Sequence, residues 1–122
     1  IILPAKGGAS ITPDSIKTSA GALLRIDVCK VPNLKTAAYY LMESGFDIVA
    51  CTEKTDNYIY DVDLTKPTAI VMGAEDKGIS DGIRKLANAE AKIPMVGNIG
   101  SLNVSVATSV ILYEAVRQRV RK

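Results

Sequence analysis

The residues of this chain that could do chemistry gather in two glycine-rich segments. In the first, Gly73 and Gly78 bracket Glu75 directly after an apolar run. Glycines at such a point allow a sharp turn and a close approach of the backbone to a ligand. Glu75 could accept hydrogen bonds from an amine, a ribose or a basic side chain. An ordinary turn with a solvated acid is the alternative, and the sequence matches neither the Walker loop nor the dinucleotide fingerprint.

The second segment follows a short apolar strand that ends near Pro94. Gly97 and Gly100 keep the next loop open, and Ser101 and Asn103 then offer a hydroxyl and an amide where a long helix begins. Simple capping by Asn103 is the alternative, but it leaves the glycines and Ser101 unexplained. We expect the two segments to follow adjacent strands of one sheet and to share a pocket.

The chain contains no histidine, which removes the commonest general base and the usual zinc ligand. An enzyme built from it must work by positioning or take a base from elsewhere, and we expect no metal site. Cys29 and Cys51 are single cysteines in apolar, strand-like surroundings. We expect both to be reduced core residues, with a disulfide or a catalytic thiol as the alternative.

Length and composition fit one soluble globular domain. The chain has 122 residues, of which 48% are apolar and 23% charged. No apolar run reaches the roughly 18 residues of a membrane span, and no signal peptide is visible at the start. The first residue is Ile1, within what reads as a strand, so we expect an N-terminally truncated piece of a longer chain.

The charge of the chain is small but unevenly placed. A formal net charge of +2 gives no strong basic footprint for binding a nucleic-acid duplex. Basic residues crowd the C-terminus, however, at Arg117, Arg119, Arg121 and Lys122. They fit either a favourable placement at the negative end of a helix dipole or a surface that faces RNA.

The remaining pattern alternates between strand and helix signals, which predicts an α/β domain with a mostly parallel sheet flanked by helices. One helix is capped by Asn33 and ended by Gly45. Residues 52–66 read as a loop or edge segment. The other helices are expected over 12–19, 80–88 and 103–119, and the strands over 1–4, 26–31, 46–51, 68–72 and 91–95.

The final helix is apolar around more than one face. Such a helix must be buried on two sides, of which the sheet can cover only one. A missing N-terminal segment or a second subunit would have to cover the other. The apolar residues are Val104, Val106, Ala107, Val110, Ile111, Leu112, Tyr113, Ala115 and Val116.

Both glycine-rich segments, together with Leu112-Tyr-Glu-Ala-Val-Arg117, closely resemble the second and third motifs of the SpoU (TrmH) branch of the SPOUT RNA methyltransferases. Ser19-Ala-Gly-Ala22 adds a further likeness, so the resemblance covers essentially the whole chain. It implies S-adenosylmethionine as methyl donor and a ribose 2′-hydroxyl as acceptor, with enzymes that methylate a guanosine of 23S rRNA as the nearest likeness. The alternatives are a tRNA 2′-O-methyltransferase, a non-catalytic module that binds a nucleotide or S-adenosylmethionine, and a flavodoxin-like domain that binds a phosphate-bearing ligand at Gly73.

The resemblance also implies a single methyltransferase domain over 1–122, a C-terminal trefoil knot, a homodimer through the C-terminal helix, and a cytoplasmic location with RNA as partner. The family's first motif carries an arginine proposed to activate the ribose hydroxyl, and these 122 residues do not contain that motif. By the same resemblance the catalytic residues are Glu75, Ser101 and Asn103. The residues that would bind the cofactor are Gly73, Gly78, Ile93, Met95, Gly97, Leu102 and Asn103.

Overall fold

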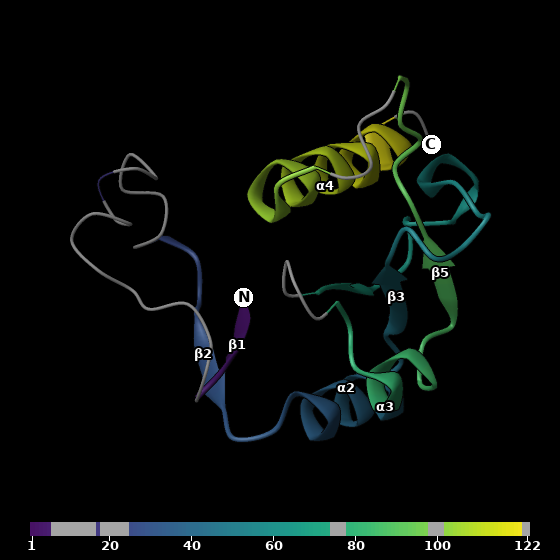
Figure 1. Cartoon of the computed structure of the whole chain (residues 1–122). Helices are drawn as coiled ribbons and strands as arrows, with labels where there is room; N and C mark the ends of the chain where they lie inside the picture. The colour runs from purple at the N-terminus through teal and green to yellow at the C-terminus, as the bar shows by residue number, and fades with distance from the viewer. Residues whose placement is uncertain (6–16, 18–24, 74–77, 98–101, 121–122) are drawn as a thin grey trace. The chain divides into compact units, whose positions relative to one another are not determined.

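A computed structural model describes residues 1–5, 17, 25–73, 78–97 and 102–120. The chain divides into two compact units, Ile1–Ala37 and Ala38–Lys122 (Figure 1). The first unit holds strands β1 (Ile2–Pro4) and β2 (Cys29–Val31), which pair in parallel with Ile2 opposite Cys29. The strand expected over 26–31 is therefore shorter than predicted. The helix expected over 12–19 lies outside the described residues, except for Lys17.

Helix α2 (Leu34–Glu43) begins and ends where local residues predict. The Asn33 side-chain oxygen accepts hydrogen bonds from the backbone N–H groups of Lys35 (2.9 Å) and Thr36 (3.2 Å). Two N–H groups that have no partner inside the helix are thereby satisfied. After the helix, Gly45 adopts a φ of 93°, a conformation that side chains other than glycine rarely allow.

The second unit is built on a three-stranded parallel sheet in the order β4–β3–β5. Its strands are β3 (Asp47–Cys51), β4 (Thr68–Met72) and β5 (Ala89–Ala91). Strand β3 pairs with both others, so β4 and β5 are not adjacent. The expectation that the two glycine-rich segments follow adjacent strands is therefore wrong, because the order of strands depends on pairings between distant parts of the chain.

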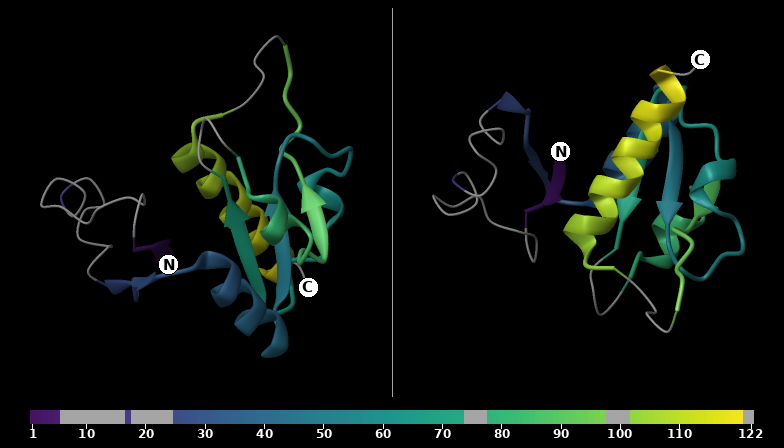
Figure 2. Two further views of the ribbon diagram at one scale, coloured as in Figure 1. Left: turned by 60° about the horizontal axis from the view of Figure 1, so that its bottom comes forward. Right: turned by 90° about the horizontal axis from the view of Figure 1, so that it is seen from above.

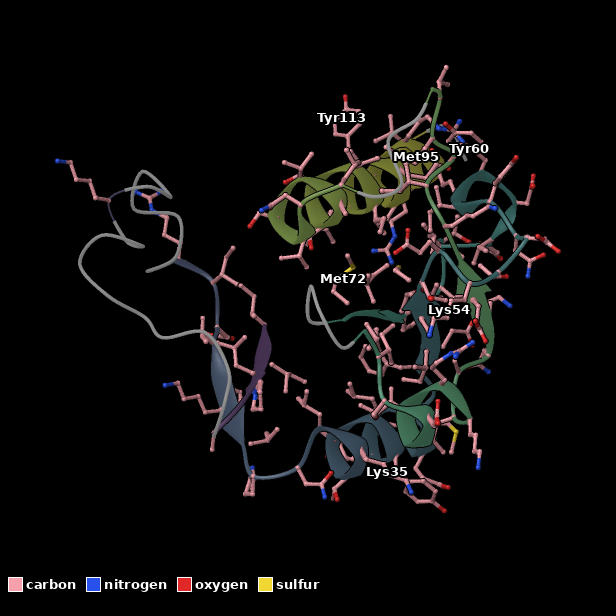
Figure 3. All side chains as sticks on the ribbon, in the orientation of Figure 1. Lys35, Lys54, Tyr60, Met72, Met95 and Tyr113 are labelled. Carbon is pink, nitrogen blue, oxygen red and sulfur yellow. The ribbon has the colours of Figure 1, made fainter. Side chains whose placement is uncertain are left out.

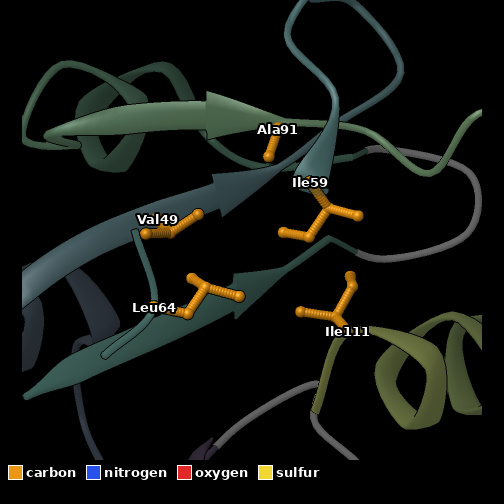
Figure 4. Packing of buried hydrophobic residues seen from close by; sticks show 5 residues of the cluster. All are labelled: Val49, Ile59, Leu64, Ala91 and Ile111. Atoms are coloured by element: carbon orange, nitrogen blue, oxygen red, sulfur yellow. The ribbon is translucent and has the colours of Figure 1, made fainter. Parts of the chain in front are cut away.

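Both faces of the sheet are covered. Ile48 and Ala50 of β3 are buried on one face, and α2 and α3 (Asp81–Arg84) lie on that side, whereas α4 (Val104–Val120) lies on the other (Figure 2). The α4 side holds the main hydrophobic cluster, shown in Figure 4. The cluster consists of Val49, Ile59, Leu64, Ala91 and Ile111.

Helix α3 and strand β5 both differ from their predicted bounds for one reason. The predicted helix over 80–88 stops at Arg84, and β5 starts two residues before the predicted strand over 91–95 and ends at Ala91, the only residue that the two share. Asn88 already pairs with the middle strand: its side-chain oxygen accepts from the N–H of Ile48 (2.7 Å), and its own N–H donates to the Ile48 carbonyl (2.8 Å). Sheet pairing therefore begins at Asn88, where the sequence pattern predicts the end of the helix.

The segment between β3 and β4 is more ordered than a plain loop. It contains the short 3₁₀ helix η2 (Ile59–Asp61), and its side chains Ile59 and Leu64 are completely or almost completely buried. Tyr58 pairs in parallel with Lys92, just past the end of β5. The segment thus extends the edge of the sheet and also covers part of its core.

Against the described residues, helix α4 buries one side. Ile111 and Glu114 are buried, and Ala115 packs against the main cluster. The opposite side is apolar but exposed, and Tyr113 points away from the sheet there (Figure 3). Its exposed apolar residues are Val106, Val110, Leu112, Tyr113, Val116 and Val120. No helix in the described part of the chain is long and apolar enough to cross a membrane.

Candidate functional site

The ends of three parallel strands meet at one edge of the sheet. Met72 and Ala91 are both level with Cys51 in the strand register. Neighbouring strands lie about 4.8 Å apart, so β4 and β5 end about 10 Å from each other with β3 between them. Although the strands are not adjacent, both glycine-rich segments leave the sheet at this edge, where ligands of parallel sheets commonly bind.

The first segment closes tightly on itself at Gly73. A Cβ atom at Gly73 would lie 2.5 Å from the carbonyl carbon of Gly78 and 2.8 Å from the nitrogen of Ile79. No side chain fits in that space, so the requirement for glycine here is steric. Gly78 itself has a φ of 68°, which also favours glycine. The two glycines therefore lie in close contact, and Glu75 between them lies outside the described residues.

The second segment continues from β5 past the end of the sheet. Ile93 packs against the main cluster, and Met95 is half-buried. The chain then becomes exposed at Val96 and turns at Gly97, whose φ is 85°. The segment thus offers an apolar base followed by an open turn.

Helix α4 brings its first residues to the same edge. Near its C-terminal end, Gln118 accepts a hydrogen bond from the N–H of Leu64 (2.8 Å), four residues before β4 begins. The end of α4 therefore lies beside the start of β4, and the start of α4 lies toward the end of β4. Figure 2 shows strands β3 and β4 pointing toward the end of the domain at which α4 begins. The start of α4, which directly follows Leu102 and Asn103, therefore lies toward the end of the domain where Gly73 follows β4.

Asn103 acts as the cap of α4. Its side-chain oxygen accepts from the N–H of Ser105 (2.8 Å), and its carbonyl accepts from Ala107 (2.9 Å). The capping alternative is thus confirmed, and it holds the side chain at the mouth of the helix. Ser101, the neighbouring predicted residue, lies outside the described residues.

The predicted site residues include none from the middle strand, although the strand itself was expected over 46–51. Cys51 ends β3 between the two glycine-rich segments, and Thr52 follows it. The N–H of Thr52 donates to the Ala91 carbonyl (2.9 Å), and its hydroxyl oxygen accepts from the N–H of Lys54 (3.2 Å). Both residues therefore belong to the floor of the site. No local motif marks them, and only a known strand order would have pointed to them.

The sulfur side chains at this edge are apolar in character. Burial raises the pKa of the Cys51 thiol to about 12, so it stays protonated near neutral pH. Met72 packs against the same cluster and points from β4 toward α4 (Figure 3). Cys51 agrees with the prediction of a reduced, largely buried residue, whereas Cys29 is exposed on β2 and is not a core residue.

The basic residues near the C-terminus have structural partners. Arg117 donates two hydrogen bonds to the carboxylate of Glu114 (2.7 and 2.8 Å). Arg119 donates to the backbone carbonyls of Leu64 (3.1 Å) and Lys66 (3.0 Å). These contacts tie both arginines to neighbouring groups of the chain, and the two predicted interpretations, a favourable placement at the helix end and a surface that faces RNA, both stay predictions. The other two basic residues of the group lie outside the described part of the chain.

A separate hollow of about 360 Å³ lies beside the segment that follows β3. None of the residues predicted for the site lines it. Its polar lining is dominated by carboxylates, which would repel the phosphates of RNA. The lining residues are Asp47, Val49, Asn57, Asp61, Val62, Asp63, Asn88 and Ala89.

Comparison with known proteins identifies the same architecture elsewhere. Residues 1–113 match the family model described as the SpoU rRNA Methylase family. The 23S rRNA (guanosine-2′-O-)-methyltransferase RlmB of Pseudomonas putida is 40% identical over 119 residues, which cover 98% of this chain. Among solved structures, the SpoU methyltransferase AviRb of Streptomyces viridochromogenes, in complex with AdoMet, aligns over 99% of this chain with a TM-score of 0.88 and 31% identity. The TrmH/SpoU tRNA modifying enzyme of A. aeolicus aligns over 99% with a TM-score of 0.82 and 36% identity.

The relatives are longer than this chain. The matched region spans 48% of the Pseudomonas protein, 50% of the Streptomyces chain and 62% of the A. aeolicus chain. Residues 1–122 thus correspond to one part of each relative.

Proposed function

Because this chain belongs to the SpoU rRNA methylase family, we propose that it forms the cofactor-binding part of an RNA methyltransferase that uses S-adenosylmethionine and acts on a ribose 2′-hydroxyl. The proposed acceptor is a guanosine of 23S rRNA, as named for the Pseudomonas relative. The single observation that carries the proposal is the meeting of three strand ends and the mouth of α4 at one edge, with Gly73 so close to Gly78 that no side chain fits.

The described residues fit an adenosyl group at this edge. The separation of about 10 Å between the ends of β4 and β5 suits a nucleoside lying across the middle strand. Backbone groups near Gly73, Ile93 and Leu102 would hold it, as the family resemblance implies, with Gly78, Met95 and Gly97 completing the two loops. Met72 and Ile93 provide apolar surface beneath it. S-adenosylmethionine, when bound, supplies an electrophilic methyl group on a positively charged sulfur.

The chain's own contribution to the reaction is positioning. Direct transfer of a methyl group requires the acceptor oxygen to lie in line with the bond that breaks, and correct alignment can supply a large part of the rate. Asn103, held at the helix mouth by its capping bonds, would orient groups at the reacting centre. We assign Ser101 and Glu75 to the same centre by family resemblance. The proton of the ribose hydroxyl must leave with a base that these residues do not supply.

Transfer RNA is the main alternative substrate. The A. aeolicus structure is of a tRNA modifying enzyme and aligns with this chain as completely as the Streptomyces enzyme does. A module that binds S-adenosylmethionine without turnover is the second alternative, since the family's first motif, which carries the arginine proposed to activate the ribose hydroxyl, is not among these 122 residues. Ribose-methylation mapping of ribosomal and transfer RNA from a deletion strain separates the three: one lost methyl in 23S rRNA is expected, and one lost in tRNA or none at all would support the alternatives.

We propose in addition a trefoil knot at the C-terminal end and a homodimer through α4 in a cytoplasmic enzyme. The knot is proposed because the resemblance to the family implies it. The dimer is supported by the apolar exposed side of α4, on which Tyr113 is 73% exposed and Leu112 is 51% exposed. Contiguous exposed apolar surface of this kind marks an interaction site. Leu112→Glu should convert the dimer to a monomer in sedimentation experiments, and a wild-type protein that stays monomeric at micromolar concentration would contradict the dimer.

The proposed cofactor is tested directly by calorimetry. The intact protein should bind S-adenosylhomocysteine, and Asn103→Ala should lower turnover on RNA far more than it lowers the melting temperature. Binding of FMN in place of S-adenosylhomocysteine would favour the flavodoxin-like alternative. Full activity of Asn103→Ala would remove this residue from the site.

A further inference from the structure

Hydrogen bonds connect the C-terminal turns of α4 to the segment that leads into β4. The Gln118 side-chain amide donates to the Val62 carbonyl (2.9 Å), and its oxygen accepts from the N–H of Leu64 (2.8 Å). Arg119 adds hydrogen bonds to the carbonyls of Leu64 and Lys66. Gln118 therefore pairs with the backbone much as a neighbouring strand would, across more than fifty residues of sequence.

A buried carboxylate holds the Gln118 amide in one orientation. Glu114 has a side chain that is only 8% exposed, and it accepts from the amide nitrogen of Gln118 (2.7 Å). The same carboxylate accepts two hydrogen bonds from Arg117. Because a carboxylate only accepts, the amide nitrogen of Gln118 must face Glu114 and Val62, which leaves its oxygen for Leu64.

These hydrogen bonds join the C-terminal end of α4 to the segment just before β4. The candidate site lies at the opposite ends of the same two elements. Strand β4 ends at Met72, directly before Gly73, and α4 begins directly after Asn103. Fifteen residues separate Asn103 from Gln118, which is about 22 Å along a helix. A helix of this length moves as a nearly rigid rod, so a shift or rotation at Gln118 is passed on to Asn103.

We infer that Gln118 and Glu114 are positioning residues of the candidate site, which set α4 along β4 and thereby place Asn103 opposite Gly73. The inference rests on the proposed function, because its consequence is the affinity for the adenosyl cofactor. Neither residue touches the site itself. Both were absent from the predicted site residues, since Gln118 contacts backbone groups distant in sequence and Glu114 acts through Gln118.

The test compares two variants of the intact protein at a temperature where each is fully folded. Gln118→Met keeps the length and the unbranched shape of the side chain but removes both hydrogen bonds of Gln118 to the segment before β4, while those of Arg119 remain. Ile83→Val shortens a buried side chain of α3 on the opposite face of the sheet and serves as the control for lost stability. Glu114→Gln, which keeps an acceptor for Gln118, provides a milder second variant should Gln118→Met fold poorly.

Affinity for S-adenosylhomocysteine, measured by calorimetry, should fall about tenfold in Gln118→Met, since small misplacements of binding groups have effects of this order or larger. It should fall less in Glu114→Gln and stay within about twofold of wild type in Ile83→Val. Faster hydrogen exchange at the Leu64 amide would show that the contact has opened.

Unchanged affinity in Gln118→Met, with faster exchange at Leu64, would overturn the positioning role and leave the proposed function intact. An equal loss of affinity in Ile83→Val would also overturn it, because the effect would then follow from stability alone. Failure of the wild-type protein to bind S-adenosylhomocysteine would overturn the proposed function, and the positioning role with it.

Discussion

Replacement of Gly73 by alanine probes the candidate site at the point where the backbone leaves least room. The described glycines with positive φ are Gly45, Gly78 and Gly97, so the backbone of Gly73 accepts alanine without strain in φ. The added methyl group, however, would lie 2.5 Å from the carbonyl carbon of Gly78 and 2.7 Å from its Cα. The whole effect of the substitution therefore comes from this contact.

The size of the effect follows from those distances. Ordinary contact begins at 3.4 Å, so the neighbouring backbone must move by about 0.9 Å. Overpacking of this degree costs about 1–3 kcal/mol of folding stability. Because the atoms that must move belong to the first glycine-rich segment, we expect the affinity for S-adenosylhomocysteine to fall by about 10- to 100-fold.

Calorimetry with S-adenosylhomocysteine and urea denaturation measure the two effects separately. Gly45→Ala is the matched control, since it makes the same chemical change at a glycine with no atom within 4 Å of the added methyl group. Its positive φ should cost about 1–2 kcal/mol of stability. Both variants should thus be less stable, but only Gly73→Ala should bind the cofactor analogue more weakly.

Wild-type affinity in Gly73→Ala would refute the reasoning, because the close approach at Gly73 would then have no part in binding. An equal loss of affinity in both variants would refute it as well. In that case loss of stability, and not the geometry of the loop, would account for the weaker binding.

Three further predictions concern the core and the titratable groups. Ile111→Ala should lower the free energy of unfolding by about 2–5 kcal/mol in urea denaturation, because Ile111 is almost completely buried in the main cluster. Iodoacetamide at pH 8 should alkylate the exposed Cys29 and spare Cys51, whose pKa is raised to about 12 by burial; equal labelling in mass spectrometry would contradict this. The hydrogen bond from Arg117 lowers the pKa of Glu114 in the folded state, so its stabilisation is complete above the unfolded pKa and is lost as pH falls through the folded pKa. Glu114→Gln should therefore be less stable than wild type at pH 7, by about 1–2 kcal/mol, and the difference should shrink below about pH 4.

Local signals predicted several elements closely. Strand β4 has the predicted bounds, and α2 is capped by Asn33 and ended by Gly45 as expected. Each of these features depends on residues within a few positions of one another: a short apolar run, an asparagine before a helix, a glycine after it. Such information is contained in any short stretch of sequence.

The candidate site was predicted in outline for a related reason. Glycines directly after strands and polar residues at the start of a helix are local patterns, and the rule that parallel strands end at a common edge then brings them together. Gly73, Ile93 and Asn103 lie at that edge, as the elements that carry them require. The roles of these three residues in the site, like those of Glu75 and Ser101, remain predictions.

Only the tertiary structure decided how the elements combine. It placed β3 between β4 and β5, ended α3 early because Asn88 pairs with Ile48, and brought Gln118 to the backbone of Leu64. Each of these outcomes is a contact between residues about twenty or more positions apart, from the pairing of Asp47 with Thr68 to the contact of Leu64 with Gln118. The free energy of such a contact depends on which other residues the fold brings to the same place. The sequence near either residue therefore does not predict the contact. The sequence by itself determined which segments form strands, helices and turns, and the folded chain alone determined which of them are neighbours.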